Sequence, residues 1–125
     1  MDVEQDVYFA EISWNQLLKE LRKHKVTYTE IPRFPSVRRD LALLLDKSVT
    51  FAQIEKIAFE SEKKLLKEVS LFDVYEGKNL EAGKKSYAVS FILQDETKTL
   101  TDAQIESIMK KLLTNFETQL GAKLR

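Results

Sequence analysis

Apolar positions recur at helical spacing in two parts of the chain. The stronger signal lies after Thr101, where one helical stripe collects Ile105, Ile108, Met109, Leu112, Leu113 and Phe116. Thr101 is followed three residues later by Gln104, a capping-box pattern, and Gly121 suits the left-handed position at a helix end. Thr50 and Gln53 repeat the capping pattern before a second stripe formed by Phe51, Ile54, Ile57 and Ala58. The pattern therefore predicts two capped amphipathic helices.

Apolar-rich segments around these helices are typical of strands. They cover residues 37–45, 68–76 and 85–93, with a short last strand at 122–125. The resulting order is β-α-β-β-α-β. With right-handed crossovers, this order gives a four-stranded antiparallel sheet with both helices on one face. We predict an α+β fold with the ferredoxin-like arrangement.

Alternation along the strands predicts which side chains point toward the helices. The expected core consists of Leu41, Leu43, Ile54, Ile57, Phe72, Val74, Val89, Phe91, Ile105, Met109, Leu112 and Phe116, with Tyr87 also pointing inward. The opposite face is left open. It is expected to present Asp40, Ala42, Leu71, Asp73, Tyr75, Ser86, Ala88 and Ser90.

The first 31 residues differ from the rest of the chain. The run 7–12 resembles a strand, and Ser13 with Gln16 predicts a capping box and a short helix from Trp14 that fades near residues 23–25. The prolines of segment 32–35 indicate a linker, with Phe34 as its anchor. We therefore expect a short strand-helix extension over 1–31 and a domain over 32–125.

Composition narrows the classes of function. The 125 residues include no Cys and one His, which excludes disulfides, zinc-thiolate sites and thiol nucleophiles and argues against a His-rich metal site. Lys and Arg total 20 and Asp and Glu total 20, so the formal net charge is zero. Such a balance lacks the basic footprint of a protein that grips a long duplex. No membrane span or secretory signal is evident, which favours a cytoplasmic protein.

The open face has the chemistry of a base-reading surface. Tyr75 offers a ring on which a base can stack, and Asp73 can accept the N–H groups of a guanine edge. Many open sheets simply face water, and composition alone favours that interpretation. Arg38 and Arg39 are either strand-end ion pairs or phosphate contacts, one on each face. The glycines at 77 and 83 bracket a hairpin loop rather than a phosphate-binding loop, since no helix follows.

Four ordered motifs resemble a known family. They are Phe34–Leu43, Leu71–Lys78, Gly83–Ser86 and Thr99–Asp102. In order and spacing they are similar to the C-terminal ferredoxin-fold anticodon-binding domain of bacterial phenylalanyl-tRNA synthetase beta chains. The resemblance covers residues 32–125. Residues 1–31 resemble the end of the catalytic-like but inactive module that precedes this domain.

The resemblance implies a role in reading the anticodon stem-loop of tRNA(Phe). The family's base-reading positions correspond to Asp73, Tyr75 and Ser86. Candidate contacts to the RNA backbone are Arg38, Arg39, Lys78, Lys84 and Lys85. The parent enzyme implied by the resemblance is an ATP- and Mg²⁺-dependent phenylalanine–tRNA ligase, an alpha2-beta2 assembly whose active site lies in the alpha chain. The domain itself is expected to carry no catalytic residue, metal or cofactor, and to bind neither membrane nor DNA.

Two other classes share this topology. A small-molecule regulatory module of the amino-acid-sensing kind would bind its ligand at a dimer interface. A plain RNA-recognition motif would need aromatic residues facing outward on its central strands, where this chain has Ser and Ala. A catalytic function is the weakest of the alternatives, because no carboxylate pair stands beside a nucleophile or a ligand set.

Overall fold

The computed structural model describes residues 5–28 and 30–125. The chain divides into two compact units, residues 1–31 and residues 32–125. No described helix is long and apolar enough to cross a membrane.

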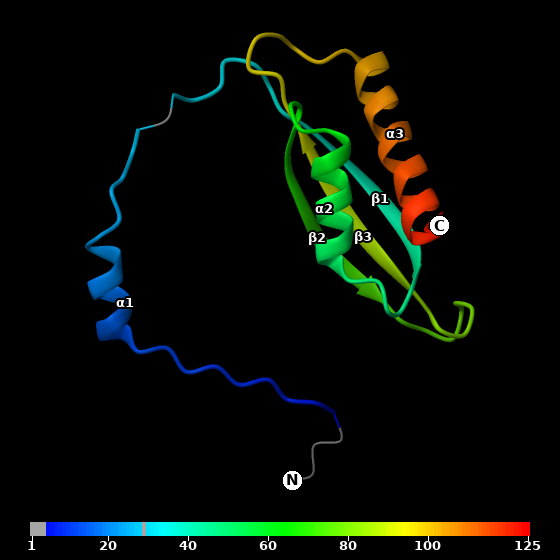
Figure 1. The fold of residues 1–125 in the computed structure, drawn as a ribbon, viewed down its shortest axis with the longest axis horizontal. Helices are drawn as coiled ribbons and strands as arrows, with labels where there is room; N and C mark the ends of the chain where they lie inside the picture. Colours follow the sequence, from blue (N-terminus) through cyan, green and yellow to red (C-terminus); the bar gives the residue numbers. More distant parts are fainter. Residues whose placement is uncertain (1–4, 29) are drawn as a thin grey trace. The chain divides into compact units, whose positions relative to one another are not determined.

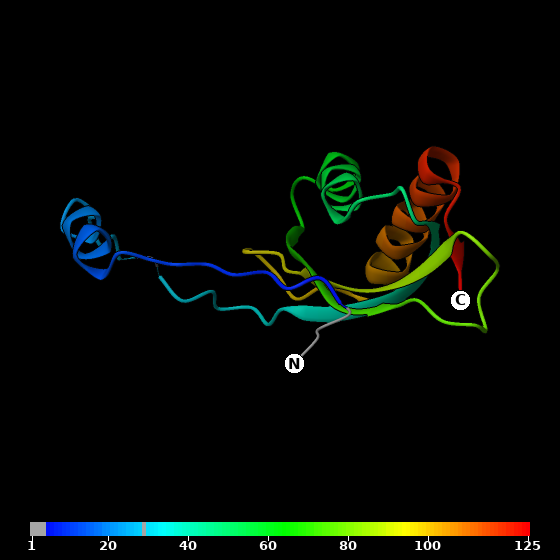
Figure 2. The same cartoon turned by 90° about the horizontal axis from the view of Figure 1, so that it is seen from below.

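Residues 32–125 form the predicted ferredoxin-like α+β fold. The elements are β1 (Val37–Asp46), α2 (Phe51–Ser61), β2 (Leu66–Tyr75), β3 (Lys84–Leu93), α3 (Asp102–Leu120) and β4 (Lys123–Leu124). The sheet has the order β2-β3-β1-β4, and all its pairs are antiparallel. Both helices lie on one face of the sheet, as Figures 1 and 2 show, so the other face is free of secondary structure within this unit.

The ends of α2 and α3 follow the local sequence signals. At α3, the Thr101 N–H donates to Gln104 Oε1 at 3.1 Å and the Gln104 N–H donates to Thr101 Oγ1 at 3.4 Å. At α2, the Thr50 N–H donates to Gln53 Oε1 at 2.8 Å. Gly121 ends α3 with a φ of 62°, the left-handed conformation that glycine adopts without steric cost. Both predicted capping boxes are confirmed.

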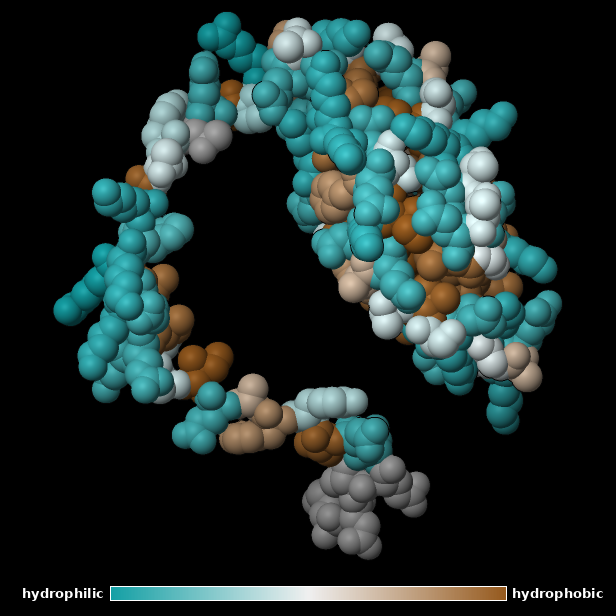
Figure 3. Space-filling model, in the orientation of Figure 1, coloured by the Kyte–Doolittle hydropathy of each residue, from teal (hydrophilic) through white to brown (hydrophobic). Residues whose placement is uncertain are grey.

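The core lies between the sheet and the two helices. Its largest fully buried side chains are Phe91, Phe116, Leu43, Leu45, Ile54, Leu93, Leu112 and Val89. The rings of Phe91 on β3 and Phe116 on α3 have centroids 6.0 Å apart. Leu41 and Met109, two predicted core residues, are only partly buried against this cluster. The space-filling view shows apolar side chains between α2 and α3, flanked by hydrophilic ones (Figure 3).

Two predicted core residues, Phe72 and Val74, are not buried. Phe72 is 54% exposed and Val74 is 47% exposed, whereas Leu71, expected outside, packs against the core. Val74 pairs with the buried Tyr87 and so faces the helices as predicted, but it is not buried there. Phe72 faces outward because of a bulge in β2: Leu71 pairs with Val89, but Asp73 pairs with its neighbour Ala88. Phe72 is the extra residue, and it reverses the alternation along the strand. Asp73 and Tyr75 therefore still face outward, as predicted.

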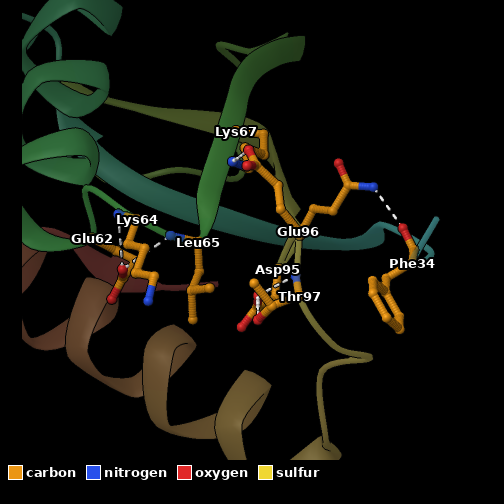
Figure 4. Close-up of polar contacts among 9 residues, drawn as sticks. Phe34, Glu62, Lys64, Leu65, Lys67, Asp95, Glu96 and Thr97 are labelled. Atoms are coloured by element: carbon orange, nitrogen blue, oxygen red, sulfur yellow. Dashed lines mark hydrogen bonds and ion pairs between the residues drawn. The ribbon is translucent and has the colours of Figure 1, made fainter. Parts of the chain in front are cut away.

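Polar contacts fix the segment that follows the C-terminal end of β3 (Figure 4). Thr97 donates both its hydroxyl and its backbone N–H to Asp95 Oδ1, at 2.7 and 2.8 Å, and these bonds lower the pKa of the Asp95 carboxyl. Glu96 pairs with Lys67 at 2.7 Å, which lowers the pKa of Glu96. Gln94 Nε2 donates to the Phe34 carbonyl at 2.7 Å, so segment 32–35 is tied to the domain at the predicted anchor.

Residues 1–31 form a separate unit, and its described part contains one helix, α1 (Trp14–Leu21). The helix was predicted, but Ser13 makes no side-chain capping bond, so the capping box is wrong, and the helix ends before residues 23–25. Residues 7–12 form no strand. The helix buries none of its residues, and its apolar side chains Trp14, Leu17, Leu18 and Leu21 are exposed.

Candidate nucleic-acid interface

The structure brings the three predicted base-reading residues together on the open face. Tyr75 on β2 lies directly across from Ser86 on β3, and Asp73 lies across from Ala88. Ala88 pairs on its other side with Ala42 of β1. An aromatic ring and a carboxylate thus border a floor of small side chains.

The polar groups of this patch differ in their surroundings. The carboxylate of Asp73 is exposed and makes no hydrogen bond or ion pair with any described residue. The Ser86 hydroxyl likewise has no hydrogen-bond partner among the described residues, although the residue is only 4% exposed. Both groups therefore have unused hydrogen-bonding capacity.

Two arginine–aromatic pairs cross the open face. The Arg38 guanidinium on β1 lies 5.2 Å from the ring centroid of Phe72 on β2. The guanidinium of Arg125, the residue after β4, lies 4.9 Å from the ring centroid of Tyr75. Because β3 lies between β1 and β2, both pairs span it. We attribute the low exposure of the β3 serines on this face to these longer side chains above them.

Arg125 is the component of this surface that the sequence analysis missed. Its backbone N–H donates to the Ala42 carbonyl at 2.9 Å, which continues the β4 pairing by one residue. The predicted last strand contained a signal: alternation places Lys123 and Arg125 on the same face, and Lys123 pairs with the outward-facing Leu44. The contact with Tyr75 depends on two strands that are not neighbours, so no local pattern indicates it.

Gly77 lies against the hydroxyl end of the Tyr75 ring. A Cβ atom at position 77 would overlap the ring's hydroxyl oxygen and the carbon that bears it. The chain therefore passes close to the hydroxyl end of the ring, an approach that only glycine permits. Tyr75 is thus positioned by Gly77 and Arg125, and it is only partly exposed.

The residues predicted to contact the RNA backbone fall into three groups by their positions in the structure. Arg38, Lys78 and Lys84 lie on the open face or in the β2–β3 loop. Arg38 pairs with Asp40 and Lys84 with Asp46, each at 2.9 Å. Lys78 and Lys84 also line a hollow of about 450 Å³ beside Gly77. Arg39 is exposed, but it pairs with Phe91 and so points to the helix face.

Lys85 does not fit the expectation of a solvent-facing lysine. It is 6% exposed, and its ammonium donates to the Lys47 carbonyl at 2.9 Å and to the Tyr87 hydroxyl at 2.7 Å. Its neighbour across the sheet, Leu45, is fully buried. Alternation places residue 85 on the helix face, where the long stem can be buried while the charged end is hydrogen-bonded. Lys85 therefore belongs to the structural framework.

Within residues 5–28 and 30–125, no group of three His, Cys, Asp or Glu side chains could hold a metal ion. What the open face offers is stacking on Tyr75, hydrogen bonding to Asp73 and Ser86, and cationic side chains around them. These are the means by which sheet surfaces recognise unstacked bases.

Comparison with known proteins agrees with this chemistry. A model of the ferredoxin-fold anticodon binding domain family matches residues 32–125. The chain is 68% identical over 124 residues to a phenylalanine–tRNA ligase beta subunit of Bacteroides fragilis, and 60% identical over the same length to one of Porphyromonas gingivalis. It is 40% identical to the corresponding subunit of Clostridium tetani. These matches cover 99% of the chain but only 15–16% of each relative.

Proposed function

The chain belongs to the ferredoxin-fold anticodon-binding domain family, and we propose that it serves a phenylalanine–tRNA ligase beta subunit by binding the anticodon stem-loop of tRNA(Phe). The observation that carries the proposal is the placement of Tyr75, Asp73 and Ser86 on adjacent strands of the uncovered sheet face. A stem-loop presents unstacked bases, the form of RNA that side chains on a sheet can reach.

The three residues have different roles in this proposal. Tyr75 supplies a stacking surface, worth about 1–3 kcal/mol for one base. Asp73 and Ser86 bind the edge of that base, because an unpaired carboxylate can accept from a guanine N–H and a hydroxyl can donate or accept. Stacking tolerates any base, so discrimination between bases depends on the edge contacts.

Cationic side chains around the patch are proposed to position the RNA backbone. Lys78 and Lys84 lie together at the hairpin hollow, next to Gly77 and hence to Tyr75. Arg38 lies elsewhere on the open face, paired with Asp40. Ion pairs between such exposed groups are weak, so phosphates can compete for the same cations. Phosphate contacts position a nucleic acid without specifying its sequence.

The remaining parts of the proposed assembly lie outside this chain. We infer that the parent subunit joins an alpha subunit in an alpha2-beta2 ligase of the cytoplasm, which uses ATP and Mg²⁺ to charge tRNA. Residues 1–31 would then be the end of the catalytic-like module that precedes the domain. The exposed apolar side chains of α1 support this, since the parent subunit would supply a surface to cover them.

The decisive experiment is a titration with two stem-loops, one with the phenylalanine anticodon and one altered at its first anticodon base. The 125-residue chain should bind the first more tightly. Tyr75→Ala should weaken binding of both by about 1–3 kcal/mol through lost stacking. Asp73→Ala should reduce the difference between the two stem-loops more than it reduces affinity, because it removes an edge contact.

Matched controls test whether the effects are local. Tyr28→Ala removes an exposed tyrosine from the first unit, and Glu106→Ala removes an exposed carboxylate from α3. Both should leave binding and discrimination unchanged. If Tyr75→Ala and Asp73→Ala bind both stem-loops as the parent chain does, the open face is not the anticodon site.

A further inference from the structure

The backbone of Arg125 is hydrogen-bonded to strand β1, and its side chain lies over the Tyr75 ring on the open face. The backbone N–H donates to the Ala42 carbonyl at 2.9 Å, and the guanidinium carbon is 4.9 Å from the Tyr75 ring centroid. Strands β1 and β3 separate β4 from β2, so the side chain of Arg125 reaches toward Tyr75 across the floor of small residues. The guanidinium therefore covers one side of the ring proposed to receive a base.

No acidic side chain among residues 5–28 and 30–125 pairs with the Arg125 guanidinium. Two other cations of the open face form ion pairs, Arg38 with Asp40 and Lys84 with Asp46. Within the described part of the chain, the Tyr75 ring is the only group seen in contact with the Arg125 guanidinium. A guanidinium on an aromatic ring keeps its five N–H donors available around its edge.

A base that stacks on the covered side of the Tyr75 ring would compete with the Arg125 guanidinium. Stacked rings lie in van der Waals contact, so a base on this side of Tyr75 would occupy the position that Arg125 now holds. A cation–π contact at an exposed site is weak, about 0.5–1 kcal/mol, whereas stacking of a base contributes about 1–3 kcal/mol. The base can therefore displace the guanidinium while the backbone of Arg125 stays paired with Ala42.

We propose that Arg125 is an RNA-binding residue that covers Tyr75 in the free domain and moves to a phosphate of the bound loop when a base takes its place. The inference rests on the proposed function of the open face. A planar guanidinium can bind phosphate through two parallel hydrogen bonds, which lysine cannot reproduce. The phosphate beside the stacked base lies within reach because the backbone of Arg125 remains anchored at the edge of the same patch.

Salt dependence of stem-loop binding measures this transfer. Each phosphate contact adds about 0.7 to the slope of log affinity against log salt for a single strand. Arg125→Ala should therefore lower that slope by about 0.7 and weaken binding about fivefold at ~50 mM salt and about twofold at ~200 mM salt. Arg125→Lys keeps the charge, so it should keep most of the slope while losing part of the affinity.

Lys123→Ala is the matched control. It removes a positive charge two residues away, on an exposed side chain for which no contact with Tyr75 is seen. At ~50 mM salt, where Arg125→Ala is expected to weaken binding about fivefold, Lys123→Ala should weaken it by no more than about twofold. A loss as large as that of Arg125→Ala would mean that any charge at this edge acts equally, which would overturn the specific role of Arg125.

The Nε–H resonance of Arg125 reports the movement directly. In the free chain its chemical shift should change in Tyr75→Leu, because the ring current of the tyrosine is removed. Addition of the stem-loop to the parent chain should shift the same resonance away from its free position, in the direction typical of a phosphate-bound guanidinium. A resonance that is unaffected by RNA, while amides of β2 and β3 shift, would overturn the proposal.

The outcomes distinguish this inference from the function on which it rests. Absence of stem-loop binding by the parent chain, or unchanged binding by Tyr75→Ala, overturns the function of the open face and this inference with it. If Tyr75→Ala weakens binding but Arg125→Ala binds more tightly with an unchanged slope, Arg125 is only a cover. If Arg125→Ala changes neither affinity nor slope, it has no role in binding. Either of the last two results overturns the inference and leaves the proposed function standing.

Discussion

From residue 86 to residue 91, strand β3 presents large side chains to the helices and small ones to the open face. Tyr87, Val89, Phe91 and Leu93 are buried on the helix side, and Ser86, Ala88 and Ser90 alternate with them on the other side. Large side chains on the first side fill the space under α2 and α3. Small ones on the second side leave room for the rings and guanidinium groups above them. Side chains on one face of β3 thus stabilise the fold, and those on the other face form part of the proposed recognition surface.

The difference between the faces predicts that substitutions will affect either folding or binding. The largest effect is expected at Phe91, which is fully buried and packs against Phe116. Phe91→Ala should lower the free energy of unfolding by about 3–5 kcal/mol, measured by urea denaturation, because it leaves a cavity. Ser90→Ala, next to it on the open face, should cost less than about 1 kcal/mol. Similar losses for the two would contradict the assignment of the faces.

Lys84 and Lys85 are adjacent in sequence and point to opposite faces. Lys85→Ala removes the donor to the Lys47 carbonyl and the Tyr87 hydroxyl, so it should cost about 1–3 kcal/mol of stability. Lys84→Ala removes an ion pair that is partly exposed and should cost about 0.2–1 kcal/mol. In stem-loop titrations the order should reverse: Lys84→Ala should flatten the salt dependence, and the folded Lys85→Ala chain should bind as the parent does. Equal effects of the two in both assays would contradict this division.

Gly77 offers a way to disturb the recognition surface without touching a proposed contact. A methyl group there would overlap the Tyr75 hydroxyl and displace the ring, while the backbone of Gly77 has no left-handed φ that would strain alanine. Gly77→Ala should therefore weaken stem-loop binding by about 1 kcal/mol, part of the stacking energy, with little change in urea midpoint. Asn79→Ala in the same loop is the control and should bind normally. Unchanged binding of Gly77→Ala would mean that the ring's position is unimportant.

Phe72 tests the bulge itself. Because its ring is half exposed and contacts Arg38, Phe72→Ala should cost only about 0.5–1 kcal/mol of unfolding free energy. A loss near the value expected for Phe91→Ala would show that regular alternation continues through residue 72 and that the bulge is absent.

Several features of the fold follow from short stretches of sequence. Capping boxes act over three residues and helical stripes over a few turns, so the beginnings of α2 and α3 and the end of α3 could be predicted. Alternation within β3 is also local, and it correctly assigned Tyr87, Val89 and Phe91 to the core. The anticodon-binding resemblance depends on four motifs in order, and the family comparison supports it independently.

Alternation in β2 could be predicted only for part of the strand. A bulge depends on how two strands pair, and nothing within residues 66–75 requires one. Leu71 and Phe72 were therefore exchanged between the faces, while Asp73 and Tyr75, which follow the bulge, were placed correctly. The same limit applies to residues 7–12, whose apolar run has no pairing partner within the described part of its unit.

Local sequence was enough to predict the order of the elements within residues 32–125, the starts of α2 and α3, the end of α3 and the small residues of the open face, because these depend on neighbours within one turn of helix or one strand. Only the tertiary structure decided that Lys85 is buried and that Arg125 covers Tyr75. Lys85 binds a carbonyl 38 positions away, and Arg125 meets a ring 50 positions away. Such contacts form only after strand pairing has brought distant segments together, so their energies are absent from any local pattern.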